Sequence, residues 1–166
     1  MAVEIERRFL VRDAAAAMRM QEAASFISQG YFGCIDRMRV RVRILADEHN
    51  RCRGVLSFKG PRRGLCRLEF EYPLALSRAR RALNSLPLPQ IIQKTRYHVP
   101  YEGLDWSVDW FEGSNIGLVL AEVELEHPDQ EIRLPPWVGD DVTFNPRYRN
   151  SHLARAPMPR RLTIAS

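Results

Sequence analysis

Charged and apolar side chains alternate along several short stretches of this chain, and this alternation constrains the fold more than any other feature. In Arg37–Ile44 an arginine occupies every second position, with methionine, valine or isoleucine between the arginines. A period of two is typical of a β-strand, whose successive side chains point to opposite faces. Val3–Leu10 and Arg67–Tyr72 repeat the pattern with glutamates. The sequence therefore predicts several strands, each with one charged and one apolar face.

The remaining segments predict more strands and a few modest helices. Extended segments are expected at Gln29–Gly33, Gly54–Lys59, Ile91–Val99, Asp105–Glu112 and Leu118–Leu125, the last two as a hairpin. Helices are expected at Ala14–Ala24, capped by Asp13, and from Ser77, as its cap, to about Leu86, whereas Pro135–Ser166 is expected to be irregular or short helical. Sequential strands with short connections favour an antiparallel sheet. The predicted class is α+β, built on a strongly curved or closed antiparallel sheet.

Length and composition indicate one globular domain. The 166 residues are 45% hydrophobic and 27% charged, without an internal repeat or a long linker. We place a single domain at 1–166, with a core at about 1–155 and a tail at 156–166. No apolar run approaches the length of a membrane span, and acidic residues stand where a signal peptide would be apolar, so a cytoplasmic protein is expected.

The cysteines and histidines argue against a zinc or disulfide framework. The three cysteines are odd in number and lack C-x-x-C spacing, so we expect reduced, packed thiols at Cys34, Cys52 and Cys66. The four histidines form no close pair. The net charge of +5 instead favours an anionic partner, with nucleic acid, acidic lipid, nucleotide and polyphosphate all open.

Side chains of like charge recur two residues apart on one face of strand after strand. The acids are Glu4, Glu6, Glu69, Glu71, Asp109, Glu122 and Glu124; the bases are Arg8, Arg39, Arg41, Arg43, Lys59, Lys94 and Arg96. Any single pair fits a solvated face, but neighbouring like charges repel, and their recurrence calls for something of opposite sign between them. An eight-stranded barrel with this face inward would enclose a charged tunnel that suits a small ligand. Carboxylates there could bind Mg²⁺ or Mn²⁺, and guanidinium and ammonium groups could bind phosphate.

The order of these motifs resembles the CYTH superfamily, also called triphosphate tunnel metalloenzymes. Glu4-Ile5-Glu6-Arg7-Arg8 resembles its E-x-E-x-K signature. Further similar segments are Arg41–Ile44, Leu56–Gly60, Arg67–Glu71, Lys94–Tyr97, Val108-Asp109, Ala121–Glu124, Trp137–Thr143, Arg147-Tyr148 and Asn150. The resemblance implies an eight-stranded antiparallel tunnel, a divalent cation and hydrolysis of a triphosphate.

Roles for individual residues are implied by the same resemblance. The metal-side residues would be Glu4, Glu6, Glu69, Glu71, Asp109, Glu122 and Glu124; the phosphate-side residues would be Arg8, Arg41, Arg43, Lys59, Lys94 and Arg96. Arg39 shares their face without a clear counterpart, and Tyr31 resembles a tyrosine near the tunnel mouth of short bacterial members, although a core aromatic fits equally. The catalytic set would be Glu4, Glu6, Arg8 and Tyr31. Arg8 replaces the signature lysine, so it can bind phosphate but cannot donate a proton near neutral pH.

Three functions remain open on these grounds. The first is a metal-dependent triphosphatase for inorganic tripolyphosphate or a compact organic triphosphate. The second is adenylate cyclase chemistry, which superfamily members perform on ATP. The third is a non-catalytic module for RNA or polyphosphate, suggested by the arginines of Arg37–Arg43, the loop residues Arg62 and Arg63, and the Arg-rich tail. No nucleic-acid or membrane partner is expected, and a homodimer would cover outer apolar faces.

Overall fold

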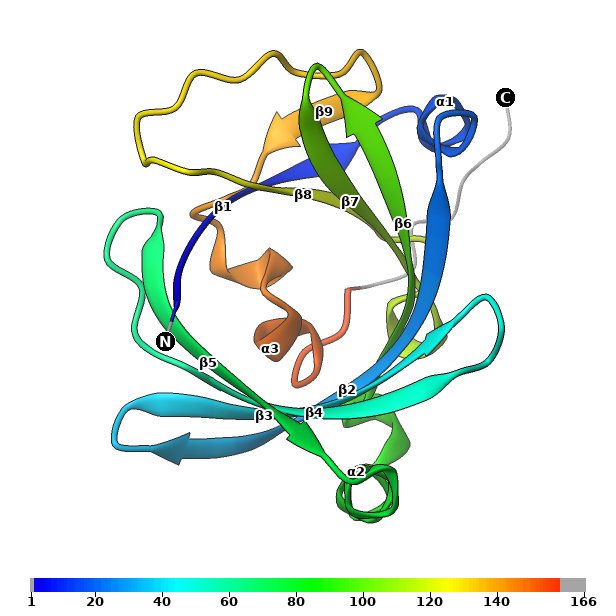
Figure 1. The fold of residues 1–166 in the computed structure, drawn as a ribbon, viewed down its shortest axis with the longest axis vertical. Coiled ribbons are helices and arrows are strands. Elements are labelled where there is room, and N and C mark those ends of the chain that lie inside the picture. Colours follow the sequence, from blue (N-terminus) through cyan, green and yellow to red (C-terminus); the bar gives the residue numbers. More distant parts are fainter. Residues whose placement is uncertain (1, 159–166) are drawn as a thin grey trace.

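Eight antiparallel strands close into a barrel in the computed structural model, which describes residues 2–158 (Figure 1). Around the ring the order is β5-β4-β3-β2-β6-β7-β8-β1, and β1 pairs with β5 to complete it. The strands are β1 (Ala2–Val11), β2 (Ala23–Ile35), β3 (Met38–Asp47), β4 (Cys52–Lys59), β5 (Cys66–Leu74), β6 (Ile92–Tyr101), β7 (Leu104–Phe111) and β8 (Val119–Glu124). The predicted closed eight-stranded barrel with a few helices is confirmed.

Short elements cover or enter this ring. A ninth strand, β9 (Val138–Asp141), pairs with the second half of β1. The helices are α1 (Ala14–Met18), α2 (Leu76–Asn84) and α3 (Asn150–Leu153), with single 3₁₀ turns η1 (Leu88–Gln90), η2 (Gly113–Asn115) and η3 (Pro146–Tyr148). In Figure 1, α2 lies outside the ring against β3 and β4, whereas α3 lies within it.

The strand register turns the charged faces inward. Glu6 lies opposite Glu124, and Arg8 lies opposite Glu122, across the β1–β8 pair. Arg41 lies opposite Ser57 across β3 and β4. Because side chains alternate along a strand, one correct register fixes the face of every other residue in that strand.

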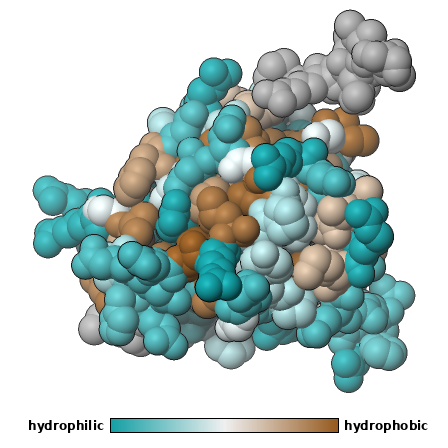
Figure 2. All heavy atoms as spheres, turned by 90° about the horizontal axis from the view of Figure 1, so that it is seen from above, coloured by the Kyte–Doolittle hydropathy of each residue, from teal (hydrophilic) through white to brown (hydrophobic). Residues whose placement is uncertain are grey.

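The apolar faces pack outside the ring. Phe9 and Trp106 are fully buried there with ring centroids 5.6 Å apart, and Trp137 packs edge-on against Trp106 at 5.7 Å. On the opposite side, α2 buries Ala79 and Leu83 against β3 and β4. Gly54 permits this approach, because a Cβ atom there would lie 3.0 Å from Ala79 Cβ of α2 and 2.5 Å from the carbonyl oxygen of Leu74 in β5. Seen from above, hydrophobic atoms remain in the middle of the surface, ringed by hydrophilic atoms (Figure 2).

Three expectations about the elements were wrong. The first helix ends at Met18 and β2 begins at Ala23, because pairing of Ala23 with His98 in β6 overrides the helix propensity of the alanines. Ala75, not Ser77, precedes α2 as its N-cap. The segment expected to be irregular contributes β9.

Other expectations have mixed outcomes. The three cysteines are free, but Cys34 and Cys52 are exposed rather than packed. Most of the tail, from 159 to 166, lies outside the described residues. Within 2–158, no helix combines the length and the hydropathy that crossing a bilayer requires.

Candidate functional site

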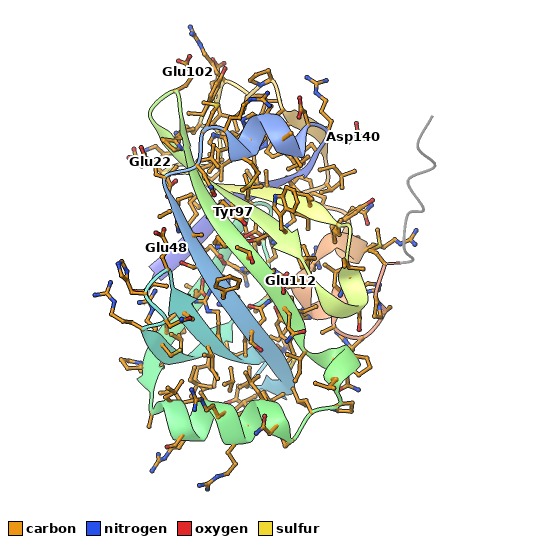
Figure 3. The ribbon with its side chains drawn as sticks, turned by 90° about the vertical axis from the view of Figure 1, so that its right-hand side faces the viewer. Glu22, Glu48, Tyr97, Glu102, Glu112 and Asp140 are labelled. Carbon is orange, nitrogen blue, oxygen red and sulfur yellow. The ribbon has the colours of Figure 1, made fainter. Side chains whose placement is uncertain are left out.

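A cavity of about 780 Å³ lies inside the barrel, and its lining is strongly charged. Eleven Arg or Lys residues line it against seven Asp or Glu residues, an excess of four positive charges with His98 neutral. Fourteen of the fifteen predicted site residues are brought together in this lining: Glu4, Glu6, Arg8, Tyr31, Arg39, Arg41, Arg43, Lys59, Glu69, Glu71, Lys94, Arg96, Glu122 and Glu124. Other acids lie elsewhere on the molecule, and Figure 3 shows Glu22, Glu48, Glu102 and Glu112 around the outside of the barrel.

Asp109 is the predicted residue that does not line the cavity. It is fully buried behind Lys94 and Arg96. Its Oδ1 accepts a hydrogen bond from Arg96 Nε at 2.7 Å, and its Oδ2 accepts from Arg96 Nη2 at 2.8 Å and from Lys94 Nζ. Both carboxylate oxygens are therefore engaged in holding two cavity cations.

Glu122 occupies the centre of a second network. Its Oε1 accepts from Arg8 Nε at 2.8 Å, and its Oε2 accepts from Arg96 Nη2 at 2.6 Å. Burial alone would raise the pKa of Glu122, but Arg8 and Arg96 outweigh it and hold this pKa well below the ordinary value. Arg8 reaches Glu6 as well, at 3.1 Å, and donates to the carbonyl of Tyr148 at 3.2 Å.

The wall formed by β3, β4 and β5 carries a third network. Arg41 Nη2 lies 3.1 Å from carboxylate oxygens of both Glu69 and Glu71. Arg43 Nη2 lies 2.6 Å from Glu71, and Lys59 Nζ lies 3.0 Å from Glu69. Burial lowers the pKa of Arg43 to about 10 and lowers that of Lys59 as well, so this wall concentrates cations away from water.

Two guanidinium groups of that wall have an unused donor. The Nε atoms of Arg41 and Arg43 are buried, and neither has a hydrogen-bond partner among the described residues. Buried donors are nearly always paired in folded proteins. An anion in the cavity would supply the missing acceptors.

Glu124 lacks the cation partner that each of the other glutamates in the cavity lining has among the described residues. Glu124 lies directly across from Glu6, with Glu4 farther along the same face of β1, and within residues 2–158 it has no ion-pair partner. Burial and the carboxylates of Glu4 and Glu6 raise the pKa of Glu124. Like charges directly opposite on paired strands are destabilising, so this corner fits a bound cation.

The carboxylates as they stand do not form a finished metal site. In the part of the chain that the structure describes, no three His, Cys, Asp or Glu side chains are placed to hold one ion. Glu4 accepts instead from Lys59 Nζ at 2.9 Å and also bonds Arg67. A divalent cation would have to displace such protein cations from Glu4 and Glu6. Oxygen ligands of this kind suit Mg²⁺ or Mn²⁺.

Four further cations that the sequence did not assign to the site line the cavity: Arg37, Arg62, Arg67 and Arg149. Arg67 lies on the inward face of β5 with Glu69, and its alternation with that residue was an available signal. Arg62 comes from the loop before β5 and bonds Glu6 rather than solvent alone. Arg149 comes from the segment before α3, and only the tertiary fold places it in the barrel.

Tyr31 lies between the cavity and an apolar cluster of the barrel. It lines the cavity and packs against the apolar cluster that contains Leu153. Its hydroxyl accepts a hydrogen bond from Gln29 Nε2 at 3.2 Å, and burial raises its pKa. A neutral phenol is therefore present at this end of the cavity.

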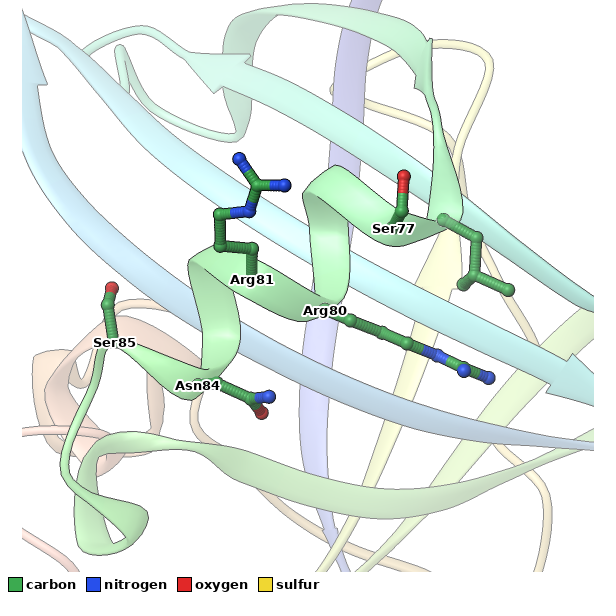
Figure 4. A pocket seen from close by; sticks show the side chains of 6 residues that line it. Ser77, Arg80, Arg81, Asn84 and Ser85 are labelled. Atoms are coloured by element: carbon green, nitrogen blue, oxygen red, sulfur yellow. The ribbon is translucent and has the colours of Figure 1, made fainter.

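A second hollow lies on the outside of the barrel, along α2 (Figure 4). Ser77, Arg80, Arg81, Asn84 and Ser85 line it together with Leu76. None of the described residues that line this hollow is acidic, and Arg80 and Arg81 are exposed on α2. It lacks the mixed charges that distinguish the tunnel.

Comparison with known proteins agrees with this geometry. The CYTH domain family model matches residues 2–156. An inorganic triphosphatase of Acetivibrio thermocellus is 38% identical over 157 residues, covering 95% of this chain and 96% of the relative. An inorganic triphosphatase of Nitrosomonas europaea is 33% identical, covering 91% and 96%. The crystal structure of the inorganic triphosphatase NE1496 superposes with a TM-score of 0.62 at 28% identity, covering 93% of this chain and 95% of that one. The chain therefore belongs to the CYTH domain family.

Proposed function

We propose that this protein hydrolyses a triphosphate in the charged tunnel, with inorganic tripolyphosphate as the substrate class. The observation that carries the proposal is the cavity's excess of four positive charges, together with the buried Nε donors of Arg41 and Arg43 that lack acceptors. A chain of phosphoryl groups supplies both negative charge and acceptor oxygens. The two curated relatives named inorganic triphosphatase support the choice of substrate.

The phosphate-binding residues in this proposal come from opposite walls of the tunnel. For the triphosphate they are Arg8, Arg41, Arg43, Lys59, Lys94 and Arg96, and Arg39 lines the cavity as the next cation of the β3 row. Guanidinium groups offer a planar fork for phosphate oxygens, whereas the lysines act as point charges. Asp109 contacts Lys94 and Arg96 and lies outside the lining, so we assign it to positioning these cations rather than to metal binding.

Membership of the CYTH family implies a divalent metal requirement. We propose Mg²⁺ or Mn²⁺ at the corner of Glu4, Glu6 and Glu124, with Glu69, Glu71 and Glu122 on the adjoining walls. When bound, such an ion neutralises phosphate oxygens and lowers the pKa of a water. Glu124 supports this placement, because it lies directly across from Glu6 and has no ion-pair partner among residues 2–158.

Catalysis by the chain's own residues is mainly electrostatic. Phosphoryl transfer needs little covalent chemistry from the protein and depends on positioning and charge stabilisation. The networks through Glu122 and Asp109 hold Arg8, Arg96 and Lys94 before substrate arrives. Preorganised donors of this kind stabilise negative charge without reorganisation during the reaction.

An assay with tripolyphosphate and ATP tests the proposal with Mg²⁺ and Mn²⁺ in separate reactions. We expect orthophosphate from tripolyphosphate; cyclic AMP from ATP without orthophosphate would instead support cyclase chemistry. Glu4→Gln should lower kcat/KM by about a hundredfold or more, because catalytic charge contributions are typically of that size. Glu22→Gln is the matched control, since Glu22 is exposed on the outside of the barrel (Figure 3). An unchanged Glu4→Gln enzyme would contradict the metal assignment.

An exposed apolar face on β1 and β5 indicates how this protein assembles. Val3 and Leu68 pair across β1 and β5 with 59% and 42% of their surfaces exposed, and Tyr72 is also exposed on β5. We propose that a second copy covers this outer apolar face, so light scattering should give a dimer that Leu68→Glu dissociates.

The free thiols support a reducing, cytoplasmic location, which cell fractionation can test.

A further inference from the structure

One group of cations in the tunnel is not compensated by carboxylates. Arg39 and Arg149 line the cavity, and within the described residues neither has an acidic partner. Arg39 Nη1 donates to the hydroxyl of Ser151, which is buried. Burial lowers the pKa of Arg149, and the charge of Arg39 lowers it further, followed by that of Arg8. Because Ser151 follows Arg149 by two residues and bonds Arg39, both arginines belong to the same part of the cavity lining.

The other inward cations of the strands are compensated. Arg41, Arg43 and Lys59 each contact glutamates of β5 or β1. Arg96 and Lys94 contact Asp109. Arg39 continues the inward row of Arg41 and Arg43 by one more step of about 6.6 Å along β3. The inward arginine row of β3 thus continues to Arg39, beyond Arg41 and Arg43, whose charges are compensated by glutamates.

The size of the cavity leaves room for more than three phosphoryl groups. A triphosphate fills roughly 400 Å³ if each phosphorus and oxygen atom is given a water molecule's share of liquid volume. The cavity measures about 780 Å³. The cavity therefore has enough volume for a further phosphoryl group in addition to a triphosphate.

We propose that Arg39, Arg149 and Ser151 form a further anion subsite that binds one phosphoryl group beyond the three held by the rest of the tunnel. This subsite rests on the proposed function, because it extends the same phosphate row. Its occupant is either the fourth group of a longer linear polyphosphate or a free orthophosphate. Arg39 and Arg149 supply two guanidinium forks to the anion, and the Ser151 hydroxyl fixes the position of Arg39.

Calorimetric titration of the full-length protein tests the subsite without depending on turnover. Tripolyphosphate, tetrapolyphosphate and orthophosphate are titrated without metal into the wild-type protein, the Arg39→Gln/Arg149→Gln double variant and Arg149→Gln alone. Orthophosphate is also titrated into protein already saturated with tripolyphosphate. Arg63→Gln is the matched control, because Arg63 is exposed and does not line the cavity. Thermal unfolding of each variant identifies any that fails to fold, in which case Arg149→Gln carries the test.

The double variant should lose about tenfold or more in affinity for tetrapolyphosphate beyond its loss for tripolyphosphate, the scale of hydrogen bonds to charged groups. If the occupant is free orthophosphate, the wild-type complex with tripolyphosphate will bind it and the double variant will not. The subsite would be overturned if the double variant lost the same affinity for tripolyphosphate as for tetrapolyphosphate and the wild-type complex with tripolyphosphate bound no orthophosphate. The two proposals can fail separately. If the wild-type protein hydrolyses no polyphosphate but the double variant selectively loses tetrapolyphosphate binding, the proposed hydrolysis is wrong and the subsite stands.

Discussion

Glu122 and Glu124 lie two residues apart on the same inward face of β8, yet their surroundings shift their pKa values in opposite directions. Burial would raise the pKa of Glu122, but Arg8 and Arg96 hold it well below its ordinary value. Burial and the neighbours Glu4 and Glu6 raise the pKa of Glu124. Glu122 and Glu124 are neighbours on one strand face, so the difference in their pKa values comes from the residues that surround each carboxylate in the barrel.

The difference separates fixed structural charge from charge that awaits a ligand. Glu122 is satisfied by protein cations, so it orients the groups that receive phosphate. Glu124 faces only like charge from β1 and is the better candidate for direct contact with a metal ion. The predictions below test this division, beginning with the largest expected effect.

Glu122→Gln should cost roughly 3–5 kcal/mol of unfolding free energy, the range for removing one partner of a buried ion pair. The buried guanidinium of Arg8 and the half-buried guanidinium of Arg96 both lose their contact with this carboxylate. Chemical denaturation measures the loss, with Glu124→Gln as the matched control on the same strand. A variant as stable as the wild type would show that the Glu122 network does not hold the wall.

Glu124→Gln should leave stability nearly unchanged and instead raise the metal concentration needed for half-maximal activity. We expect an increase of at least about tenfold, the loss typical even for groups that only support a metal ligand. Titrating activity against Mg²⁺ and Mn²⁺ measures the effect. The same metal dependence in Glu122→Gln and Glu124→Gln would remove the distinction between the two carboxylates.

The ammonium group of Lys94, which contacts Asp109, predicts that KM for tripolyphosphate depends on pH. Burial lowers its pKa to about 8, although Asp109 acts in the opposite direction. The charged ammonium predominates below that pH and is lost above it, so KM for tripolyphosphate should rise roughly fivefold between pH 7 and 9 as a charged hydrogen bond disappears. Lys94→Arg should flatten this rise, because a guanidinium stays charged. An identical rise in the variant would assign the effect to another group.

Arg8→Lys should separate the contribution of Arg8 to stability from its contribution to turnover. The guanidinium contacts Glu122, Glu6 and the Tyr148 carbonyl, and a lysine cannot keep all three contacts. We expect a loss of about 1–2 kcal/mol in unfolding free energy together with a gain in kcat, because an ammonium can donate a proton. Denaturation and steady-state kinetics measure the two quantities; Arg8→Gln, which should lower both, is the control. A fall in kcat for Arg8→Lys would show that the guanidinium is the better group in this chain.

Local sequence was sufficient for the strands and for which residues face inward. The alternation in Arg37–Ile44 predicted the inward row of β3, and Arg39, Arg41 and Arg43 all line the cavity. Local sequence did not predict where the first helix ends, because that boundary depends on strand pairing with a distant segment. The alanines after Asp13 favour helix, but Ala23 joins β2 because β6 offers a paired edge.

The sequence by itself determined a barrel of alternating strands with its charges gathered on one face, because a period of two is a local property of the backbone. Only the tertiary structure decided which charges meet. Asp109 and Glu124 look alike in the sequence, yet one is enclosed by Lys94 and Arg96 and the other faces Glu6. It also brought Arg149 from the C-terminal segment into the cavity. The reason is physical: an electrostatic interaction depends on the distance and burial of groups far apart in the chain, which no local pattern encodes.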